Sequence, residues 1–327
     1  MTPIAAITAN GIALATEVQK RIISVSYHDA SGTTADQLVL ELDDSDGTLN
    51  IPPKGAELTL QLGYKGKALH NKGTFTVDDV EHAGPPDKLI ITARSANFRE
   101  EFKTLRSTHW EPGTTLGALV ATIAERYNLA PKVAPDLADL ALAQLNQTAE
   151  SDSAFLNRIG KQFDAVATSK NGYLLFFPKG QGATASGAAL PMATIAKNQT
   201  TDHRYKTADR NSRFTGVTAR WYNNDTAQTE TVTVGEAGYT KQIRDPLPDE
   251  QQAGEAAKAE WARIQRGDAT MSITVEPGRP ELVNGQPVAL SGWKGDIDAH
   301  SWVIEDLNHT ASDSGLVTAV ELVTKKG

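Results

Sequence analysis

The chain has 327 residues and a formal net charge of −8, from 40 acidic and 32 basic residues. Hydrophobic residues make up 39% and charged residues 22%, which excludes an intrinsically disordered chain or a fibre and predicts about two or three globular domains. The absence of cysteine excludes disulfides and thiolate metal sites, and the acidic balance opposes a protein that holds nucleic-acid phosphates on a broad cationic face.

The N-terminal segment, residues 1–21, is mildly apolar but does not have the pattern of a secretory signal. Thr8 and Asn10 interrupt the apolar run, and no basic residue precedes it. No apolar stretch in the sequence is long enough for a membrane helix. We therefore expect a protein that is made and folded in the cytoplasm, with no membrane anchoring.

Residues 1–105 are predicted to form a first β-barrel module. Apolar residues alternate with polar ones along short stretches, and clusters such as D-S-D-G and N-I-P-P-K-G separate these stretches as turns. The pattern favours a small antiparallel barrel or sandwich. The alternating apolar positions are Val39, Leu40 and Leu42, then Leu58, Leu60 and Leu62, then Phe75, Val77 and Val80.

Residues 106–180 are predicted to form an α+β middle domain. Apolar side chains fall on one face of a helix over Thr115–Tyr127, and Asn128 is placed to end it. A second helix over Ser151–Asp164 begins at a good N-cap residue, and the strand Tyr173–Phe177 follows.

Residues 181–200 are predicted to be a linker, because Gly, Ala and Ser dominate the stretch G-Q-G-A-T-A-S-G-A-A. Residues 201–327 are predicted to form a second β-barrel module with one inserted helix at about 249–266. Acidic residues begin this helix, Arg263 and Arg266 end it, and Gly267 stops it. Its apolar stripe is Ala257, Trp261 and Ile264.

The two β-rich parts contain the same series of segments in the same order. The segment G-A-E-L-T-L-Q-L-G-Y-K-G-K begins at Gly55, and G-Q-P-V-A-L-S-G-W-K-G-D begins at Gly285. F-T-V-D-D-V-E-H at 75–82 then matches W-V-I-E-D-L-N-H at 302–309, and a further strand at 89–93 matches 316–320. The offset changes only from 230 to 227 residues, which indicates an internal duplication. The predicted fold class is thus α+β, mostly β: two similar antiparallel barrel or sandwich modules with an inserted α+β middle domain.

Two segments have partial ligand-binding patterns. Asp43–Gly47 is similar to a calcium loop, but Leu42 and Pro53 would occupy ligand positions, so we interpret it as an acidic hairpin turn. Gly180-x-Gly182-x-x-Ala185 follows an apolar strand, as a dinucleotide-binding loop would. Pro191 comes too early for the helix that such a loop requires, which favours a flexible linker.

No assembled catalytic set is visible in the sequence. It contains no GxSxG, HExxH or Walker motif, and no histidines four residues apart. His82 and His309 occupy matching positions of the repeat, which favours a hydrogen-bonding role at a strand end. The neighbours Asp78 and Asp79 would point to opposite faces of a strand. We predict no enzymatic activity and no catalytic, cofactor-binding or metal-ligating residues.

The segment H-W-E-P-G-T-T-L-G-A-L-V-A-T-I-A-E-R-Y-N-L, at 109–129, is similar to the opening of peptidoglycan-binding LysM modules. Such modules close with a second helix and a strand soon afterwards. Here a long stretch rich in alanine and leucine intervenes, so a peptidoglycan-binding or cell-wall-degrading component is kept only as an alternative.

Further segments cover nearly the whole chain in order. They are L-E-L-D-D-S-D-G, G-T-F-T-V-D-D-V-E-H-x-G-P-P-D, A-R-S-A-x-F-R-E-E-F-K-T-L-R-S-T-H-W, N-Q-T-x-E-S-D-S-A-F-L-N-R-I, G-R-P-E-L and G-W-K-G-D-I-D. Together they resemble the late control D family of tailed phages, which comprises contractile-tail baseplate hub proteins related to the base of VgrG spikes.

The resemblance implies a structural hub in the virion tail baseplate, assembled in the host bacterial cytoplasm. Its implied partners are two further copies in a homotrimer, a tail tube or tube-adaptor protein, a central spike protein and other baseplate subunits. Two similar barrels in each of three subunits would give six similar units around an axis, so one ring could match a six-fold tube and a three-fold spike. Genome DNA would pass through the lumen without specific binding.

Two related readings stay open. A VgrG-like secretion spike base would usually continue into a long β-helical spike, whereas this chain ends at Lys325-Lys326-Gly327, so we expect a separate spike protein. A bacteriocin-like particle derived from a phage would have the same sequence pattern.

Overall fold

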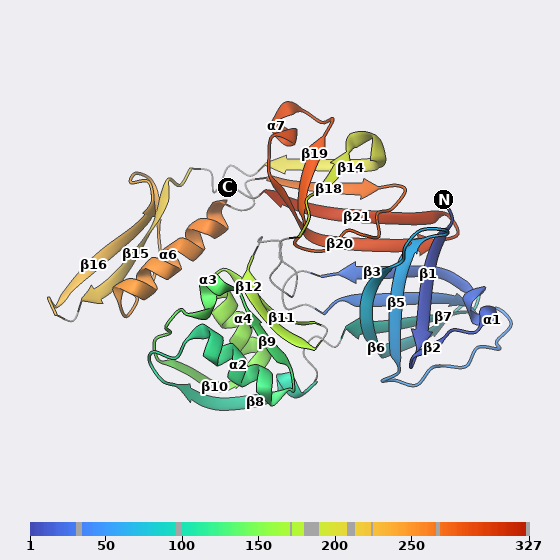
Figure 1. Cartoon of the computed structure of the whole chain (residues 1–327), viewed down its shortest axis with the longest axis horizontal. Helices are drawn as coiled ribbons and strands as arrows, with labels where there is room; N and C mark the ends of the chain where they lie inside the picture. The colour runs from blue at the N-terminus through green and yellow to red at the C-terminus, as the bar shows by residue number, and fades with distance from the viewer. Residues whose placement is uncertain are drawn as a thin grey trace.

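The structure is a computed structural model of a chain dominated by β-strands. A 13-stranded sheet runs through both β modules, and smaller sheets belong to a middle domain and to a further unit inserted in the second module (Figure 1). The described residues are 1–30, 35–95, 100–170, 172–179, 190–207, 213–223, 225–265 and 269–324.

The first module is an antiparallel sheet in the order β3-β4-β7-β6-β5-β1-β2. In Figure 1, β1 and β5 run across the direction of β3, so the sheet folds over its own core. Leu60 and Phe75 are fully buried in that core, as the alternating pattern predicts. The elements are β1 (Pro3–Ala9), β2 (Ile12–Ala13), α1 (Thr16–Gln19), β3 (Ile22–Asp29), β4 (Gln37–Asp43), β5 (Glu57–Tyr64), β6 (His70–Ala83) and β7 (Lys88–Ser95).

The middle domain is a separate α+β unit with its own core. Both expected helices form, because the side chains of Thr115 and Ser151 cap them by accepting hydrogen bonds from the backbone N–H groups of Ala118 and Ala154, each at 3.2 Å. Asn128 has a φ of 59° directly after the first helix, as expected for a residue that ends it. The elements are η1 (Glu100–Lys103), β8 (Leu105–Trp110), α2 (Leu116–Arg126), β9 (Ala130–Val133), α3 (Pro135–Ala138), β10 (Leu145–Ser151), α4 (Asp152–Gln162), β11 (Ala165–Lys170) and β12 (Tyr173–Pro178).

The second module repeats the strand order of the first, as β14-β18-β21-β20-β19-β13. One pair differs in direction, because β13 runs parallel to β19 whereas its counterpart β1 runs antiparallel to β5. Trp302 and Leu322 are buried in the core. The elements are β13 (Ala193–Ala196), η2 (Lys197–Gln199), β14 (Thr200–Thr207), β18 (Ala269–Val275), β19 (Pro287–Ser291), α7 (Gly295–Asp298), β20 (Trp302–Ser312) and β21 (Gly315–Thr324).

The insertion in the second module is larger than the single helix expected from the sequence. The helix forms as α6 (Glu250–Gln265), and its Ala257 and Ile264 are buried as predicted, while Arg266 and Gly267 lie outside the described residues. It covers a three-stranded sheet of β15 (Gly216–Asn223), β16 (Gln228–Gly235) and β17 (Thr240–Gln242). Apolar residues do alternate in these strands, at Val217, Ala219 and Trp221 and at Val232 and Val234, but alternation alone does not tell a strand of the insertion from a strand of the barrel.

Two expected boundaries also shift. The predicted linker 181–200 contains β13, whose Ile195 is fully buried; four residues of a strand are too few to stand out from an alanine-rich segment. Residues 180–189, which include the Gly180-x-Gly182-x-x-Ala185 pattern, lie outside the described chain. Phe102 is buried in the core of the middle domain, which therefore begins before residue 106.

The two modules correspond in detail as well as in strand order. The β6–β7 hairpin has a β-bulge at 77–79, and the β20–β21 hairpin has one at 304–306, the position expected from the repeat. A second bulge lies at 22–24 between β3 and β4, and its counterpart lies at 200–202 between β14 and β18. Because bulges interrupt a ladder at specific residues, this agreement supports an internal duplication.

Backbone contacts around the turns that recur in both modules agree with the same correspondence. The N–H of Gly55 donates to the carbonyl of Val77 at 2.9 Å, and the N–H of Gly285 donates to the carbonyl of Ile304 at 2.8 Å. Both glycines have positive φ angles, 85° and 78°, which a residue with a Cβ rarely adopts.

The last matched segment needs a correction. His82 lies opposite Leu89, whereas His309 lies opposite Thr318, so Leu89 corresponds to Thr318 and not to Leu316. The second hairpin is two residues longer between these positions. The constant offset of 227 residues expected from the sequence therefore does not hold in the last strand.

Candidate assembly interface

A ladder between β3 and β20 joins the two modules into one sheet. Six residue pairs connect Ser24–Asp29 with Leu307–Ser312 in antiparallel register. On the same side of β20, its first two residues pair with β19, while β21 occupies the other side. The chain therefore contains one complete junction between a first and a second module.

The buried face of this junction is built around His309, which is fully buried. Its Nε2 lies 3.1 Å from Nζ of Lys72, and its Nδ1 lies 2.9 Å from Oγ1 of Thr318. Lysine can only donate, so Nε2 is the acceptor and Nδ1 carries the proton. The Tyr27 ring stacks on the imidazole with centroids 6.1 Å apart.

Burial, with the positive charge of Lys72 beside it, lowers the pKa of His309 well below its usual value. The imidazole is therefore neutral at physiological pH. Lys72 also donates from Nζ to the carbonyl of Leu282 at 3.1 Å. Lys72, of the first module, thus donates hydrogen bonds to two groups of the second module, the imidazole of His309 and the carbonyl of Leu282.

Polar contacts reinforce the other face of the junction. Nε2 of His28 lies 2.7 Å from Oδ1 of Asp306, and both side chains are partly exposed. Oγ of Ser26 donates to Oδ1 of Asn308 at 3.0 Å. Both contacts run between β3 and β20, so side chains as well as backbone fix the register.

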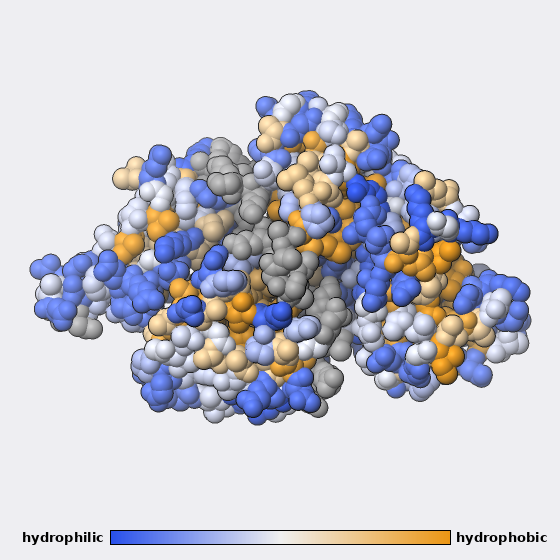
Figure 2. Space-filling view, in the orientation of Figure 1, coloured by the Kyte–Doolittle hydropathy of each residue, from blue (hydrophilic) through white to orange (hydrophobic). Residues whose placement is uncertain are grey.

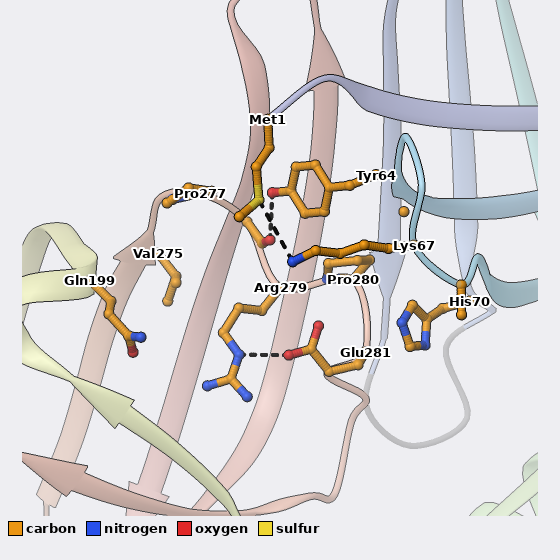
Figure 3. Close-up of a pocket in the computed structure, with 13 residues that line it drawn as sticks. Met1, Tyr64, Lys67, His70, Gln199, Val275, Pro277, Arg279, Pro280 and Glu281 are labelled. Carbon is orange, nitrogen blue, oxygen red and sulfur yellow. Dashed lines mark hydrogen bonds and ion pairs between the residues drawn. The ribbon is translucent and has the colours of Figure 1, made fainter.

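A pocket of about 340 Å³ lies beside the junction, lined by residues of both modules (Figure 3). The first module contributes Lys67 and His70, and the second contributes Arg279 and Glu281. Nε of Arg279 donates to Oε1 of Glu281 at 2.7 Å, and Tyr64 bonds the second module beside them, through its hydroxyl to the carbonyl of Gly278 at 2.7 Å. The Tyr64 bond joins the two walls of the pocket, whereas Arg279 and Glu281 pair with each other within the wall of the second module.

Apolar side chains are exposed on the first module. Figure 2 shows hydrophobic side chains gathered where Figure 1 places β1, β2 and β5. Ile12, in β2, is 74% exposed. Apolar groups exposed together on one face suit a contact with another protein.

The residues that the sequence analysis considered for ligand binding do not form one site. Within the described residues, no group of three or more His, Cys, Asp or Glu side chains could hold a metal ion. Asp46, in the acidic segment, binds Arg21 through two contacts, and this ion pair lowers the pKa of the carboxyl far below its usual range. The segment is a turn, but it is not a hairpin, because β4 and β5 do not pair.

The strand carboxylates and histidines also have separate surroundings. Asp78 pairs with Nε of Arg94 at 2.9 Å, whereas Asp79 accepts a bond from its own neighbour's N–H. His82 is partly exposed and lies 3.4 Å from Asp44, whereas His309 is buried in the middle of its strand. The expectation of a common strand-end role for His82 and His309 is therefore wrong, because β3 covers only one of them.

Sequence reasoning missed the most connected residues of the junction, Lys72 and Tyr27. Nζ of Lys72 donates to the carbonyl of Leu282, which is 210 positions away in the sequence. The sequence around Lys72 does not indicate that its side chain is buried. Tyr27 belongs to a run of alternating apolar residues that could have predicted its burial in β3.

None of the described helices combines the length with the apolar character that crossing a bilayer requires.

The fold is shared with solved structures of a tail protein and of a type VI secretion component. The tail protein from Neisseria meningitidis MC58 matches with a TM-score of 0.69 at 14% identity, covering 100% of this chain and 98% of that one. The Escherichia coli c3393 protein, a component of the type VI secretion system, matches with a TM-score of 0.55 at 11% identity, covering 98% of this chain and 77% of that one. At these identities the likeness shows the fold alone.

Sequence comparison then gives the family. The model described as phage tail baseplate hub (GPD) matches residues 54–315. Probable baseplate hub proteins of Escherichia phages 186 and P2 are each 36% identical, covering 99% and 93% of this chain and 94% and 89% of their own lengths. The chain therefore belongs to the phage tail baseplate hub family.

Proposed function

We propose that this baseplate hub protein forms a homotrimeric, pseudo-six-fold ring that joins the six-fold tail tube of a phage to its three-fold spike. The observation that carries the proposal is the correspondence between the two β modules, which share their strand order and the positions of two bulges. Two like modules in each of three subunits supply six like units around one axis. Such a ring can match six-fold symmetry on one face and three-fold symmetry on the other.

The predicted division of the chain assigns these roles to separate parts. The modules at 1–105 and 201–327 would build the ring, and the middle domain at 106–180 would lie outside it. Figure 1 shows the middle domain and the α6 unit beside the continuous sheet and not within it, which suits contacts with other baseplate subunits. One face of the ring would meet the tail tube or a tube-adaptor protein, and the opposite face would meet the spike protein.

The ring would be assembled in the cytoplasm of the host bacterium and act in the virion tail baseplate. The net charge of −8 suits a lumen through which genome DNA passes without specific binding, because like charges repel.

We also propose that the hub is not an enzyme, on the ground that its family is described by a structural role. Incubation of the purified protein with peptidoglycan should release no soluble fragments, and the protein should not sediment with the polymer. Cleavage or co-sedimentation would instead support a cell-wall-degrading or peptidoglycan-binding component.

The ring proposal is tested by measuring mass in solution and imaging the particles, with the chain alone and with the spike protein of the same phage. We expect three times the mass of one chain and a three-fold ring with six similar lobes, at the latest when the spike is present. A compact monomer under both conditions would contradict the proposal.

A further inference from the structure

We propose that the ring closes by pairing β14 of one subunit with the free end of β6, Val80–Ala83, in the next subunit, in the register that β3 and β20 show within the chain. The inference rests on the proposed trimer and deepens it, because it names the surfaces and the residues that meet. The occupant of each open edge is thus a second copy of this chain.

The correspondence between modules identifies these strands as counterparts of the internal junction. β14 corresponds to β3, because each has a bulge where it pairs with the next strand of its sheet, at 200–202 and at 22–24. β6 corresponds to β20, because each has a bulge where it pairs with the second strand of its hairpin, at 77–79 and at 304–306. Aromatic packing agrees. Tyr27 meets Phe75 edge-on at 5.7 Å and 72°, and Tyr205 meets Trp302 edge-on at 6.3 Å and 80°.

Both proposed partners are open edges of the sheet, as far as the described residues show. Among these residues β14 pairs only with β18, and every residue in β14 except Thr200 and Tyr205 is exposed. Within the same described part of the chain, the end of β6 pairs only with β7, since β5 reaches no further along β6 than Thr76. The two edges lie on different sides of the molecule in Figure 1, so they cannot pair within one chain. Unpaired strand edges invite another strand.

Burial differs between the counterparts in the way that a missing neighbour would cause. Leu307 and His309 of β20 are fully buried beneath the junction with β3. Their counterparts in β6, Val80 and His82, are half-buried and exposed. A strand added to β6 would cover both.

Transfer of the internal register gives a ladder of four residue pairs. The register is fixed by the two bulges, which align 22–24 with 200–202 and 77–79 with 304–306. The ladder ends after Ala83, because Pro85 and Pro86 have no N–H to donate. The pairs across the subunit boundary are Thr207 with Val80, Lys206 with Glu81, Tyr205 with His82, and Arg204 with Ala83.

Side-chain chemistry fits this register. Within the chain, His28 contacts Asp306 and Ser26 contacts Asn308 across the junction. The corresponding contacts between subunits join Lys206 to Asp79 and Arg204 to Glu81. Two cations on one edge would thus face two carboxylates on the other.

These charges are available for the contact. Among the residues that the structure describes, the side chains of Arg204, Lys206 and Glu81 make no hydrogen bond or ion pair. The third aligned contact is aromatic, because the Tyr205 ring takes the place of Tyr27 and would stack on His82 as Tyr27 stacks on His309.

The simplest alternative would leave an edge open. If two β14 edges paired with each other about a two-fold axis, the end of β6 would stay uncovered in both chains. Pairing of unlike edges is heterologous and generates a closed ring when the rotation is correct.

The register is tested by cross-linking in the full-length chain with its spike protein present. The chain has no cysteine, so the double variant Ala83→Cys with Arg204→Cys carries the only two thiols. Mild oxidation should yield covalent dimers and trimers on a denaturing gel. The matched control, Ala83→Cys with Lys206→Cys, displaces one thiol by two residues and should give at least about fivefold less product, since the thiols no longer lie opposite.

Exchanging the charges tests the proposed ion pairs between subunits, with mass in solution as the readout. Arg204→Glu with Lys206→Glu should weaken trimer formation at least about tenfold, and so should Asp79→Lys with Glu81→Lys. All four substitutions in one chain should restore the trimer. Circular dichroism checks that each variant folds.

The outcomes separate this inference from the proposed function. If the wild-type chain forms a trimer but the in-register cysteine variant does not cross-link, or if the charge exchange does not change assembly, the register is wrong while the proposed trimer is retained. A wild-type chain that remains monomeric with its spike would overturn both.

Discussion

At the scale of single residues, the junction between modules depends on a neutral histidine beside a buried lysine. Nε2 of His309 accepts from Lys72, and the ring of Tyr27 covers the imidazole. Thr318, Leu282 and the nearby His70 complete its polar surroundings. A proton added to this imidazole would place a second positive charge next to Lys72, so the contact is stable only in the neutral form.

Acid should therefore weaken the fold through His309. Its folded-state pKa lies below the ordinary value near 6.5, so below that pH the unfolded chain takes up a proton that the folded chain does not. The free energy of unfolding should fall by up to about 1.4 kcal/mol per pH unit, from about pH 6.5 down to the folded pKa. Urea unfolding between pH 8 and pH 5 measures this slope. His309→Asn should flatten it, whereas His109→Asn, at a partly exposed histidine of the middle domain, should not; equal slopes in all three proteins would count against the assignment.

Lys72→Met should destabilise the protein by about 1–3 kcal/mol, because the change keeps the aliphatic stem but removes the donor to Leu282 and His309. Lys65→Met, on an exposed turn of the same module, provides the matched control and should change the free energy by less than about 0.5 kcal/mol. Chemical denaturation of both variants gives the comparison. Similar effects would show that the buried contact adds nothing.

At the scale of elements, the sequence predicted what is local and periodic. The helices α2, α4 and α6 combine an apolar stripe with capping residues, and all three form near their expected bounds. The strand β13 was missed because it is only four residues long, and the strands beneath α6 were included in the barrel because alternation does not show which sheet a strand joins. The repeat predicted two like modules, but the β3–β20 ladder that joins them depends on residues about 280 positions apart, which no local pattern contains.

The α6 unit should open independently of the main sheet, because its small core has no buried residue in common with the other cores. Ala257→Glu places a carboxylate against β15 and should raise hydrogen–deuterium exchange at least about tenfold in β15, β16 and α6. Exchange in β20 and β21 should stay unchanged. Gln251→Glu, on the exposed side of the same helix, should leave both regions protected, and a rise in β20 would contradict the independence of the unit.

At the scale of the whole molecule, one chain contains one module junction that is formed and the two halves of another that are open. The resemblance noted in the sequence is confirmed by the family match, whereas the ring, its symmetry and the pairing of β14 with β6 are proposals that the geometry supports. In a ring of three chains in which each β14 pairs with β6 of the next chain, there would be six similar junctions, three within chains and three between them. No sheet edge of the junction type would remain exposed.

Electron cryo-microscopy of the hub bound to its spike tests this account most directly. The account predicts a three-fold ring of six similar β modules, with Tyr205 of each subunit stacked on His82 of the next and a sheet continuous around the ring. A ring in which β14 remains exposed, or in which the subunits meet through other surfaces, would contradict it.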